Sequence, residues 1–151
     1  MASSITPYAH YWDLIVSKGA ALYSTTIKVA LITSSYTFSA AHTIFDPGTN
    51  NSADPSYNEV PNGSGYTTGG VALANPVASS GVLTFDNPTW TGLTATYRAG
   101  IFYFSDTIDS KVNPLIAYYL PDTTPADIAV VSADWVLAID QVYGLFYNPD
   151  A

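Results

Sequence analysis

The chain has no cysteine and very little charge. Without cysteine, a disulfide framework and a thiolate metal site are both excluded. Charged residues form 11% of the sequence, less than half of the ~25% that is usual for soluble domains. Neutral polar side chains must therefore cover the surface, and such surfaces often pack against neighbouring proteins. The low charge is a first indication of assembly.

Basic side chains are the scarcest charged group. Four lysines and arginines stand against 12 acids, which gives a formal net charge of −8. Binding to phosphate backbones depends on clustered basic residues, so we do not expect direct contact with nucleic acid. Residues 1–6 carry no positive side chain, and no run approaches the ~18 apolar residues of a membrane span. We therefore expect neither a signal peptide nor a membrane span.

Apolar and aromatic residues are abundant instead. Hydrophobic residues form 48% of the 151 positions and aromatic residues form 14%, too much for a disordered chain. A chain of this length can bury roughly 70% of its unfolded surface in one core. We expect a single domain over residues 1–151.

Short apolar segments separated by turn residues predict a mainly β fold. In the clearest segment, Thr94–Phe104, side chains alternate between two faces and no proline interrupts the ladder. Leu115–Leu120 is predicted as its hairpin partner, across a loop of ten residues, SDTIDSKVNP. About seven or eight strands of this kind favour an antiparallel β-sandwich or curled barrel. The other predicted strands are residues 26–33, 71–74, 82–85, 90–93, 127–140 and 144–147.

One N-terminal α-helix is predicted over residues 7–18. Thr6 suits the N-cap, Pro7 the first turn, and Gly19 the position after the end. We expect the apolar face of this helix to cover one edge of the sheet, with docking onto a neighbouring subunit as the alternative. This face consists of Tyr8, Tyr11, Trp12 and Ile15, with Leu22 as a further candidate.

Residues 34–70 are predicted to form a long loop, because they are crowded with Ser, Thr, Asn, Asp, Pro and Gly. Within it, Tyr57–Val60 is expected to be a short ordered piece. The glycines of NGSGYTTGG (62–70) predict a turn rather than a phosphate cradle, since no helix follows them. Loops of this length are usually functional, so this one is the candidate for contacting a subunit or a ligand. Residues 75–80 predict a further turn.

Few residues have the spacing that catalysis or metal binding requires. His10 and His42 each lack a second ligand at metal spacing. A glycosidase needs a matched pair of carboxylates, which the sequence gives no reason to propose. We expect no enzyme, no cofactor and no metal. Four loop acids could contribute to a calcium site but match no calcium motif, so solvated loop acids are favoured: Asp46, Asp54, Asp106 and Asp109.

Arg98 is the only charged residue of the segment 94–104. An arginine in the middle of a strand lies on a solvated face of the sheet or pairs with a carboxylate at an interface. The first arrangement is favoured. Asp134 and Asp140 would be natural partners in the second.

The 12 tyrosines suit two different roles. They could form a platform on which sugar rings stack, as in a lectin, or they could pack a β-rich core and its subunit contacts. The candidate subunit-contact residues are aromatic side chains of the helix and the long loop, together with one cation: Tyr8, Tyr11, Trp12, Tyr36, Phe38, Phe45, Tyr57, Tyr66 and Arg98.

Four blocks of sequence occur in a characteristic order: TIKVALITSSY (26–36), NEVPNGSGYTTGG (58–70), LTFDNPTWTGLTATYRAGIFYF (83–104) and PLIAYYL (114–120). Together they resemble a family of small proteins encoded among the virion structural genes of tailed phages. The blocks mark strands and turns, so the resemblance implies a shared fold and a virion setting rather than a reaction. The chain departs from the family in its more aromatic helix and in its C-terminal segment.

The resemblance and the composition together predict a non-enzymatic structural protein of the virion. We expect a cement or decoration protein on the head surface, synthesised in the host cytoplasm, that stabilises the head by bridging capsid subunits. Its expected partners are the major capsid protein or other virion proteins, and a homo-oligomer is expected, with a trimer favoured. The alternatives are a tail or baseplate component and a carbohydrate-binding module for host attachment.

Overall fold

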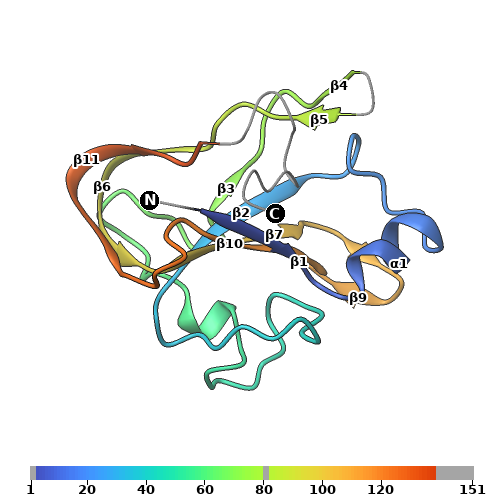
Figure 1. The fold of residues 1–151 in the computed structure, drawn as a ribbon, viewed down its shortest axis with the longest axis horizontal. Coiled ribbons are helices and arrows are strands. Elements are labelled where there is room, and N and C mark those ends of the chain that lie inside the picture. Colours follow the sequence, from blue (N-terminus) through green and yellow to red (C-terminus); the bar gives the residue numbers. More distant parts are fainter. Residues whose placement is uncertain (1–2, 80–81, 139–151) are drawn as a thin grey trace.

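A computed structural model describes residues 3–79 and 82–138 of the chain. Strand residues far outnumber helical ones, at 43% against 7%, and the strands pair in antiparallel fashion (Figure 1). This confirms the predicted mainly β, sandwich-like fold. The described residues contain eleven strands rather than seven or eight. The additional ones are very short, which is why alternation along the sequence did not reveal them.

The centre of the fold is a five-stranded sheet with the strand order β1-β10-β7-β2-β3. Strand β7 lies in the middle and pairs with β2 on one side and β10 on the other. The predicted hairpin between the segment 94–104 and Leu115–Leu120 is therefore confirmed for β7 and β10. The five strands are β1 (Ser4–Pro7), β10 (Leu115–Leu120), β7 (Ala99–Phe104), β2 (Ile27–Ile32) and β3 (Val71–Ala72).

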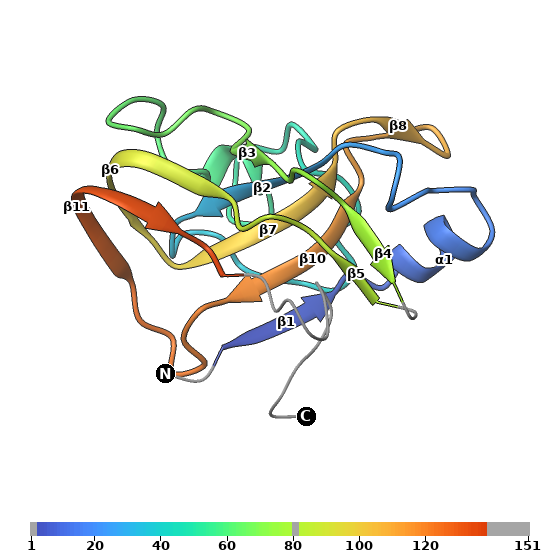
Figure 2. The same ribbon diagram turned by 90° about the horizontal axis from the view of Figure 1, so that it is seen from above.

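Both faces of this sheet are covered, because every residue of β7 is buried. Phe102 and Phe104 point into one hydrophobic cluster, and Ile101 and Tyr103 belong to a second cluster. The long loop that follows β2 lies over one face, while β4, β5, β6 and β11 lie over the other (Figures 1 and 2). The sheet thus separates two cores, which explains why β7 is apolar at consecutive positions.

The predicted strand 94–104 is in fact two strands in different sheets. Strand β6 (Thr89–Tyr97) pairs only with β11 (Ile128–Val136), and the chain enters the central sheet after Arg98. Apolar and small residues on both sides of Arg98 suit either sheet, so the sequence pattern continues across the break. Strand β6 is irregular at Gly92, where φ is +61° and the ladder with β11 changes register.

Two small hairpins decorate the edges of the fold. Strand β4 (Val77–Ser79) pairs with β5 (Val82–Thr84), so the prediction of a turn over residues 75–80 was wrong for residues 77–79. Strand β8 (Thr107–Ile108) pairs with β9 (Lys111–Val112) inside the ten-residue loop between β7 and β10. The predicted strand 144–147 lies outside the described residues.

The helix α1 (Tyr11–Val16) is shorter than the predicted 7–18. Thr6 and Pro7 belong to β1, which runs along the outer side of β10, and proline is tolerated at such an edge. His10 is the N-cap, without a side-chain hydrogen bond. The helix ends at Val16, before the predicted end at residue 18, and Gly19, whose φ is +73°, lets the chain turn back behind it.

The predicted loop 34–70 has no regular strand in the structure, but it is compact. The short 3-10 turn Ser56–Asn58 overlaps the ordered piece expected at Tyr57–Val60. Asp54 is fully buried and accepts hydrogen bonds from the amides of Asn50 and Tyr57. Side-chain to backbone bonds of this kind replace a strand ladder and give the loop a fixed shape.

Candidate functional site

The nine candidate contact residues divide into an inner and an outer group. Trp12 and Tyr57 are exposed, at 57% and 61%, and Phe38 and Arg98 are half-buried. The other five fill the two cores, so the prediction that they contact a partner is corrected: a neighbour cannot reach them in this fold. These five are Tyr8, Tyr11, Tyr36, Phe45 and Tyr66.

Helix α1 carries an exposed apolar pair, made of Trp12 from the outer group and its neighbour Val16. Tyr11 and Leu14 are both 1% exposed and anchor the helix in the core. Trp12 and Val16, four residues apart and therefore on one side of the helix, are 57% and 79% exposed. Adjacent exposed apolar side chains can mark a contact site, and tryptophan is enriched among the residues that dominate protein interfaces. Helix α1 is thus a candidate contact surface.

An ion pair connects the hairpin β8–β9 to the residues that directly follow this helix. Asp109 lies between Lys18, at 3.6 Å, and Lys111, at 3.2 Å. These cations lower the pKa of the Asp109 carboxyl, the hydrogen bond from Lys111 being the main cause. Because all three side chains are partly exposed, the pairs stabilise the protein only weakly. A carboxylate between two cations does not offer a calcium site.

The other three aspartates that were candidates for a calcium site accept hydrogen bonds from backbone amides instead. Asp46 accepts a hydrogen bond from the amide of Gly48, and Asp106 accepts one from Thr107. Asp54 takes donors on both carboxylate oxygens. Within residues 3–79 and 82–138, no three His, Asp or Glu side chains are grouped to hold a metal ion.

A chain of hydrogen bonds joins two buried tyrosines to a histidine of the long loop. The hydroxyl groups of Tyr8 and Tyr36 are 3.1 Å apart, and the Tyr36 hydroxyl is 2.7 Å from Nδ1 of His42. Burial raises the pKa of Tyr36 to about 12, so both phenols keep their protons at neutral pH. We call Tyr8, Tyr36 and His42 the tyrosine–histidine chain; sequence reasoning, which considered His42 only as a metal ligand, missed it.

Aromatic rings enclose this chain. Phe38 stacks on Tyr118 with ring centres 4.7 Å apart, and Phe38 also contacts Tyr8 at 5.4 Å. Tyr118 belongs to β10, whereas Phe38 belongs to the long loop. The stacking of these two rings therefore helps to hold the long loop against the central sheet, beyond what the burial of their surface contributes.

The long loop also forms a small pocket, with His42 in its wall. The volume of this pocket is about 240 Å³, slightly below the range typical of sites for drug-sized ligands. It has room for one side chain of a partner or a comparably small group. The pocket is lined by Ala41, His42, Thr43, Ile44, Pro47, Thr49 and Ala53.

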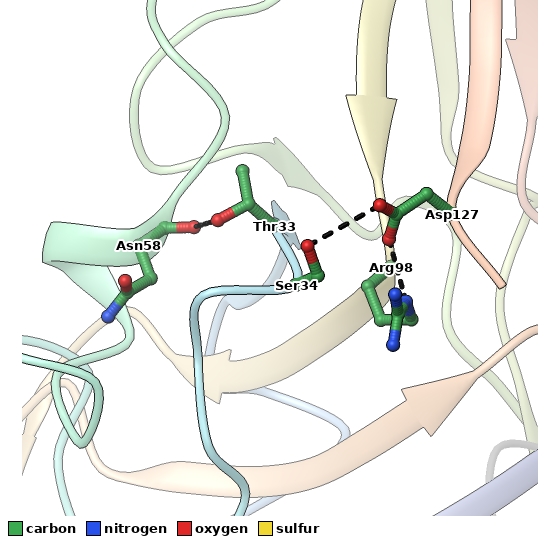
Figure 3. Close-up of polar contacts among 5 residues, drawn as sticks. All are labelled: Thr33, Ser34, Asn58, Arg98 and Asp127. Carbon is green, nitrogen blue, oxygen red and sulfur yellow. Dashed lines mark hydrogen bonds and ion pairs between the residues drawn. The ribbon is translucent and has the colours of Figure 1, made fainter. Parts of the chain in front are cut away.

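Arg98 lies where the two sheets meet (Figure 3). Its Nε donates to Oδ1 of Asp127 at 2.7 Å, and its backbone amide donates to the carbonyl of Ile32. The hydroxyl of Ser34 donates to Oδ2 of Asp127 at 3.4 Å. Arg98 thus pairs with a carboxylate, which was the less favoured arrangement, and it stands between strands rather than within one.

The prediction of Asp134 as a partner of Arg98 was wrong, and the prediction of Asp140 falls outside the described residues. Asp134 instead accepts a hydrogen bond from the amide of Gly92. Asp127 precedes β11 and is 29 positions from Arg98. No local pattern distinguishes it from the other aspartates, so sequence reasoning had no signal by which to select it.

Next to this junction, Thr33 extends the contact of β2 with the long loop. Its hydroxyl donates to the carbonyl of Asn58 at 3.0 Å (Figure 3). The backbone amide of Thr33 donates to the same carbonyl at 2.9 Å. The polar residues drawn in Figure 3 therefore form hydrogen bonds and an ion pair that join segments distant in the sequence.

Glu59 organises the glycine-rich segment 62–70. Its Oε1 accepts hydrogen bonds from the hydroxyl of Tyr66 and the amide of Gly69, both at 2.6 Å. The Tyr66 hydroxyl in turn accepts the amide of Leu31 on β2. Burial raises the pKa of Glu59 despite these bonds. The predicted turn in this segment is confirmed, since Gly63 and Tyr66 bond to each other.

Comparison of the chain with protein-family models, with curated proteins and with solved structures finds no match. None of the helices in the described residues has the length and hydrophobicity that crossing a bilayer requires.

Proposed function

We propose that this chain is a non-enzymatic structural protein of a tailed-phage virion that binds the outside of the head and bridges capsid subunits. The observation that carries the proposal is the exposed pair Trp12 and Val16 on a helix whose opposite side is anchored in the core. A capsid decoration protein needs such a rigid apolar contact. The motifs shared with the phage family supply the virion setting.

The positions of these motifs support a scaffold role. The block 26–36 contains β2, the block 83–104 contains β6 and β7, and the block 114–120 contains β10. The block 58–70 packs against β2 through Tyr66 and Glu59. The resemblance therefore concerns the sheet and its supports, while the proposed contact lies on α1, where this chain departs from the family.

Binding of α1 to a capsid subunit would remove both exposed side chains from water. Tryptophans at the centre of interfaces typically contribute 2 kcal/mol or more, equivalent to about a 30-fold change in Kd. The proposed partner is the major capsid protein, bound by a homo-oligomer, with a trimer favoured. When several subunits of one oligomer bind at once, their modest individual contacts combine into a higher overall affinity.

A binding assay with phage heads that lack the protein tests this proposal. The double variant Trp12→Ala, Val16→Ser should bind purified heads about 30-fold or more weakly than the wild type. Val131→Ser is the matched control, because Val131 is 74% exposed on β11. Equal binding by all three proteins would overturn the role of α1, and acrylamide quenching of Trp12 fluorescence would show independently that its side chain is exposed.

Localisation in the particle decides between head and tail. The proposal expects the protein on the outside of the head, and heads without it should burst at a lower temperature. Mapping of the protein to the tail or baseplate, together with heads of unchanged stability, would replace the decoration role with the tail alternative. Sedimentation of the purified protein distinguishes an intrinsic trimer from a monomer that assembles on the shell.

Exposed tyrosines support the carbohydrate-binding alternative. Tyr57 is 61% exposed on the 3-10 turn that Asp54 fixes, and Tyr23 is 60% exposed. Aromatic faces of this kind can stack on sugar rings. A glycan array of host surface saccharides tests this role: saturable binding that Tyr57→Ala abolishes would support it, and the absence of any binding would exclude attachment through these side chains.

A further inference from the structure

The segment Ser39–Phe45 of the long loop is held against β1 and β10 by few backbone bonds. The amide of Ala9 donates to the carbonyl of Ala40, the amide of Leu115 donates to the carbonyl of Thr43, and the amide of Phe45 donates to the carbonyl of Asn113. The pocket wall of the long loop belongs largely to this segment. Side chains that hold the segment in place therefore also determine the shape of the pocket.

His42 holds the segment through the tyrosine–histidine chain. The Tyr8 side chain is 0% exposed, and among the described residues its hydroxyl bonds only to Tyr36. The one arrangement that satisfies both hydroxyl hydrogens has Tyr8 donating to Tyr36 and Tyr36 donating to Nδ1 of His42. His42 must then be neutral, with its proton on Nε2.

Protonation of His42 would break this arrangement. Nδ1 would become a donor, so the Tyr36 hydroxyl would have to reverse and donate to Tyr8. The hydrogen of Tyr8 would then be buried without an acceptor, which is costly in a low-dielectric interior. The neutral form of His42 is therefore the form that fits the closed segment.

His10 bonds to β10, the strand that the segment Ser39–Phe45 packs against. Its Nε2 lies 2.8 Å from the carbonyl oxygen of Leu115, the residue whose amide holds Thr43. Since a carbonyl only accepts, Nε2 carries the proton, and the buried Nδ1 has no partner among the described residues. A second proton on Nδ1 would lack an acceptor, and Lys111 would repel the resulting charge while Asp13 attracts it.

We propose that His10 and His42 form a pH-sensitive clasp that keeps the segment Ser39–Phe45 closed at neutral pH and releases it in acid. His42 belongs to this segment, and His10 bonds to Leu115, the residue of β10 whose amide donates to Thr43. Release would expose the aromatic stack around Tyr36 and remove one wall of the pocket. His10 is also the N-cap of α1, but the clasp uses neither Trp12 nor Val16.

The direction of the pH effect follows from linkage. Burial lowers the pKa of both histidines from the ordinary value of 6.5; for His10 the Leu115 carbonyl and Asp13 oppose this shift, and Lys111 adds to it. The open segment therefore binds protons at a higher pH than the closed one does. The closed form has its full stability above pH 6.5 and loses it as the pH falls through the lowered values.

Hydrogen exchange measured by mass spectrometry tests the clasp on the full chain. After correction for intrinsic rates, peptides covering residues 39–45 should lose about tenfold or more protection between about pH 7.5 and about pH 5, one pKa unit being a factor of ten. Peptides covering β2 provide the internal reference and should change little. Equal protection of residues 39–45 at both pH values would overturn the proposal.

Matched variants identify the groups responsible. In the double variant His10→Gln, His42→Gln the amide oxygens can still accept and the amide nitrogens can still donate, but neither side chain titrates. Protection of residues 39–45 should then be independent of pH, and persistence of the wild-type pH dependence would contradict the proposal. If the double variant is open at every pH, NMR titration of wild-type His42 decides: a pKa at or above 6.5 would overturn the clasp.

Discussion

Gly70 lies directly against the backbone of Val29. A Cβ atom at Gly70 would come within 1.9 Å of the Val29 carbonyl oxygen, and the φ of Gly70 is +71°. The glycine-rich segment can therefore approach β2 only because this position has no side chain. The contact places the turn 62–70 beside the strand that Tyr66 also supports.

Gly70→Ala should lower the free energy of unfolding by about 2 to 5 kcal/mol, because backbone strain and overlap add together. Gly48→Ala is the matched control: its φ is +67°, but a Cβ there meets nothing within 4 Å. The control should lose only about 1 to 2 kcal/mol. Urea unfolding of both variants measures the difference, and equal losses would show that β2 yields to the added methyl group.

The pair Arg98–Asp127 should contribute little by charge and more by packing. The two side chains are 27% and 39% exposed, so Asp127→Asn should lower stability by less than about 1 kcal/mol. Arg98→Ala should lower it further, since the apolar stem of arginine is also lost. Unfolding at low and high salt checks this: the effect of Asp127→Asn should shrink in salt, whereas that of Arg98→Ala should persist in part.

Asp54→Asn should lower stability at neutral pH by about 1 to 3 kcal/mol, because one oxygen acceptor of a buried network becomes a donor. Burial opposes ionisation of Asp54, but hydrogen bonds from Asn50, Tyr57 and Ser56 outweigh it and lower the pKa. Its contribution is thus present above the ordinary value of 3.8 and is lost as the pH falls. Thermal unfolding as a function of pH should show a shallower acid slope in Asp54→Asn than in the wild type.

Glu59 should have the opposite effect. Its pKa is raised by burial, so the folded state retains a proton that the unfolded state releases near 4.5. Stability is therefore lost as the pH rises from that value through the raised one. Glu59→Gln retains an oxygen acceptor for Tyr66 and should flatten this part of the curve. An unchanged slope in the variant would assign the pH dependence to another group.

Short apolar segments bounded by turn residues predicted the central strands well. Strand β2 and the hairpin of β7 with β10 are apolar on consecutive positions and bounded by turn residues, so local pattern suffices to find them. The break at Arg98 was not predictable, because Tyr97 and Ala99 suit a strand on either side of it. What separates the two strands is pairing with distant segments.

The candidate contact residues show the same limit. An aromatic side chain is suited equally to a core and to an interface, so Tyr8 and Trp12 could not be distinguished by residue type. The structure distinguishes them because Tyr8, which directly follows β1, is fully buried and bonds to Tyr36 of the long loop. The expectation of a helix from Pro7 concealed β1, since a threonine followed by proline suits both a helix start and an edge strand.

The position of β1 in the sheet has a consequence for synthesis of the chain. Ser4 pairs with Leu120 and Thr6 pairs with Tyr118, while β2 pairs with β7 across most of the intervening sequence. Strand β1 leaves the ribosome before β10 and must therefore wait for it before it finds its place. Chains with so many distant pairings fold slowly, and until residue 120 has emerged the edge of β7 that β10 covers remains open to pairing with other chains.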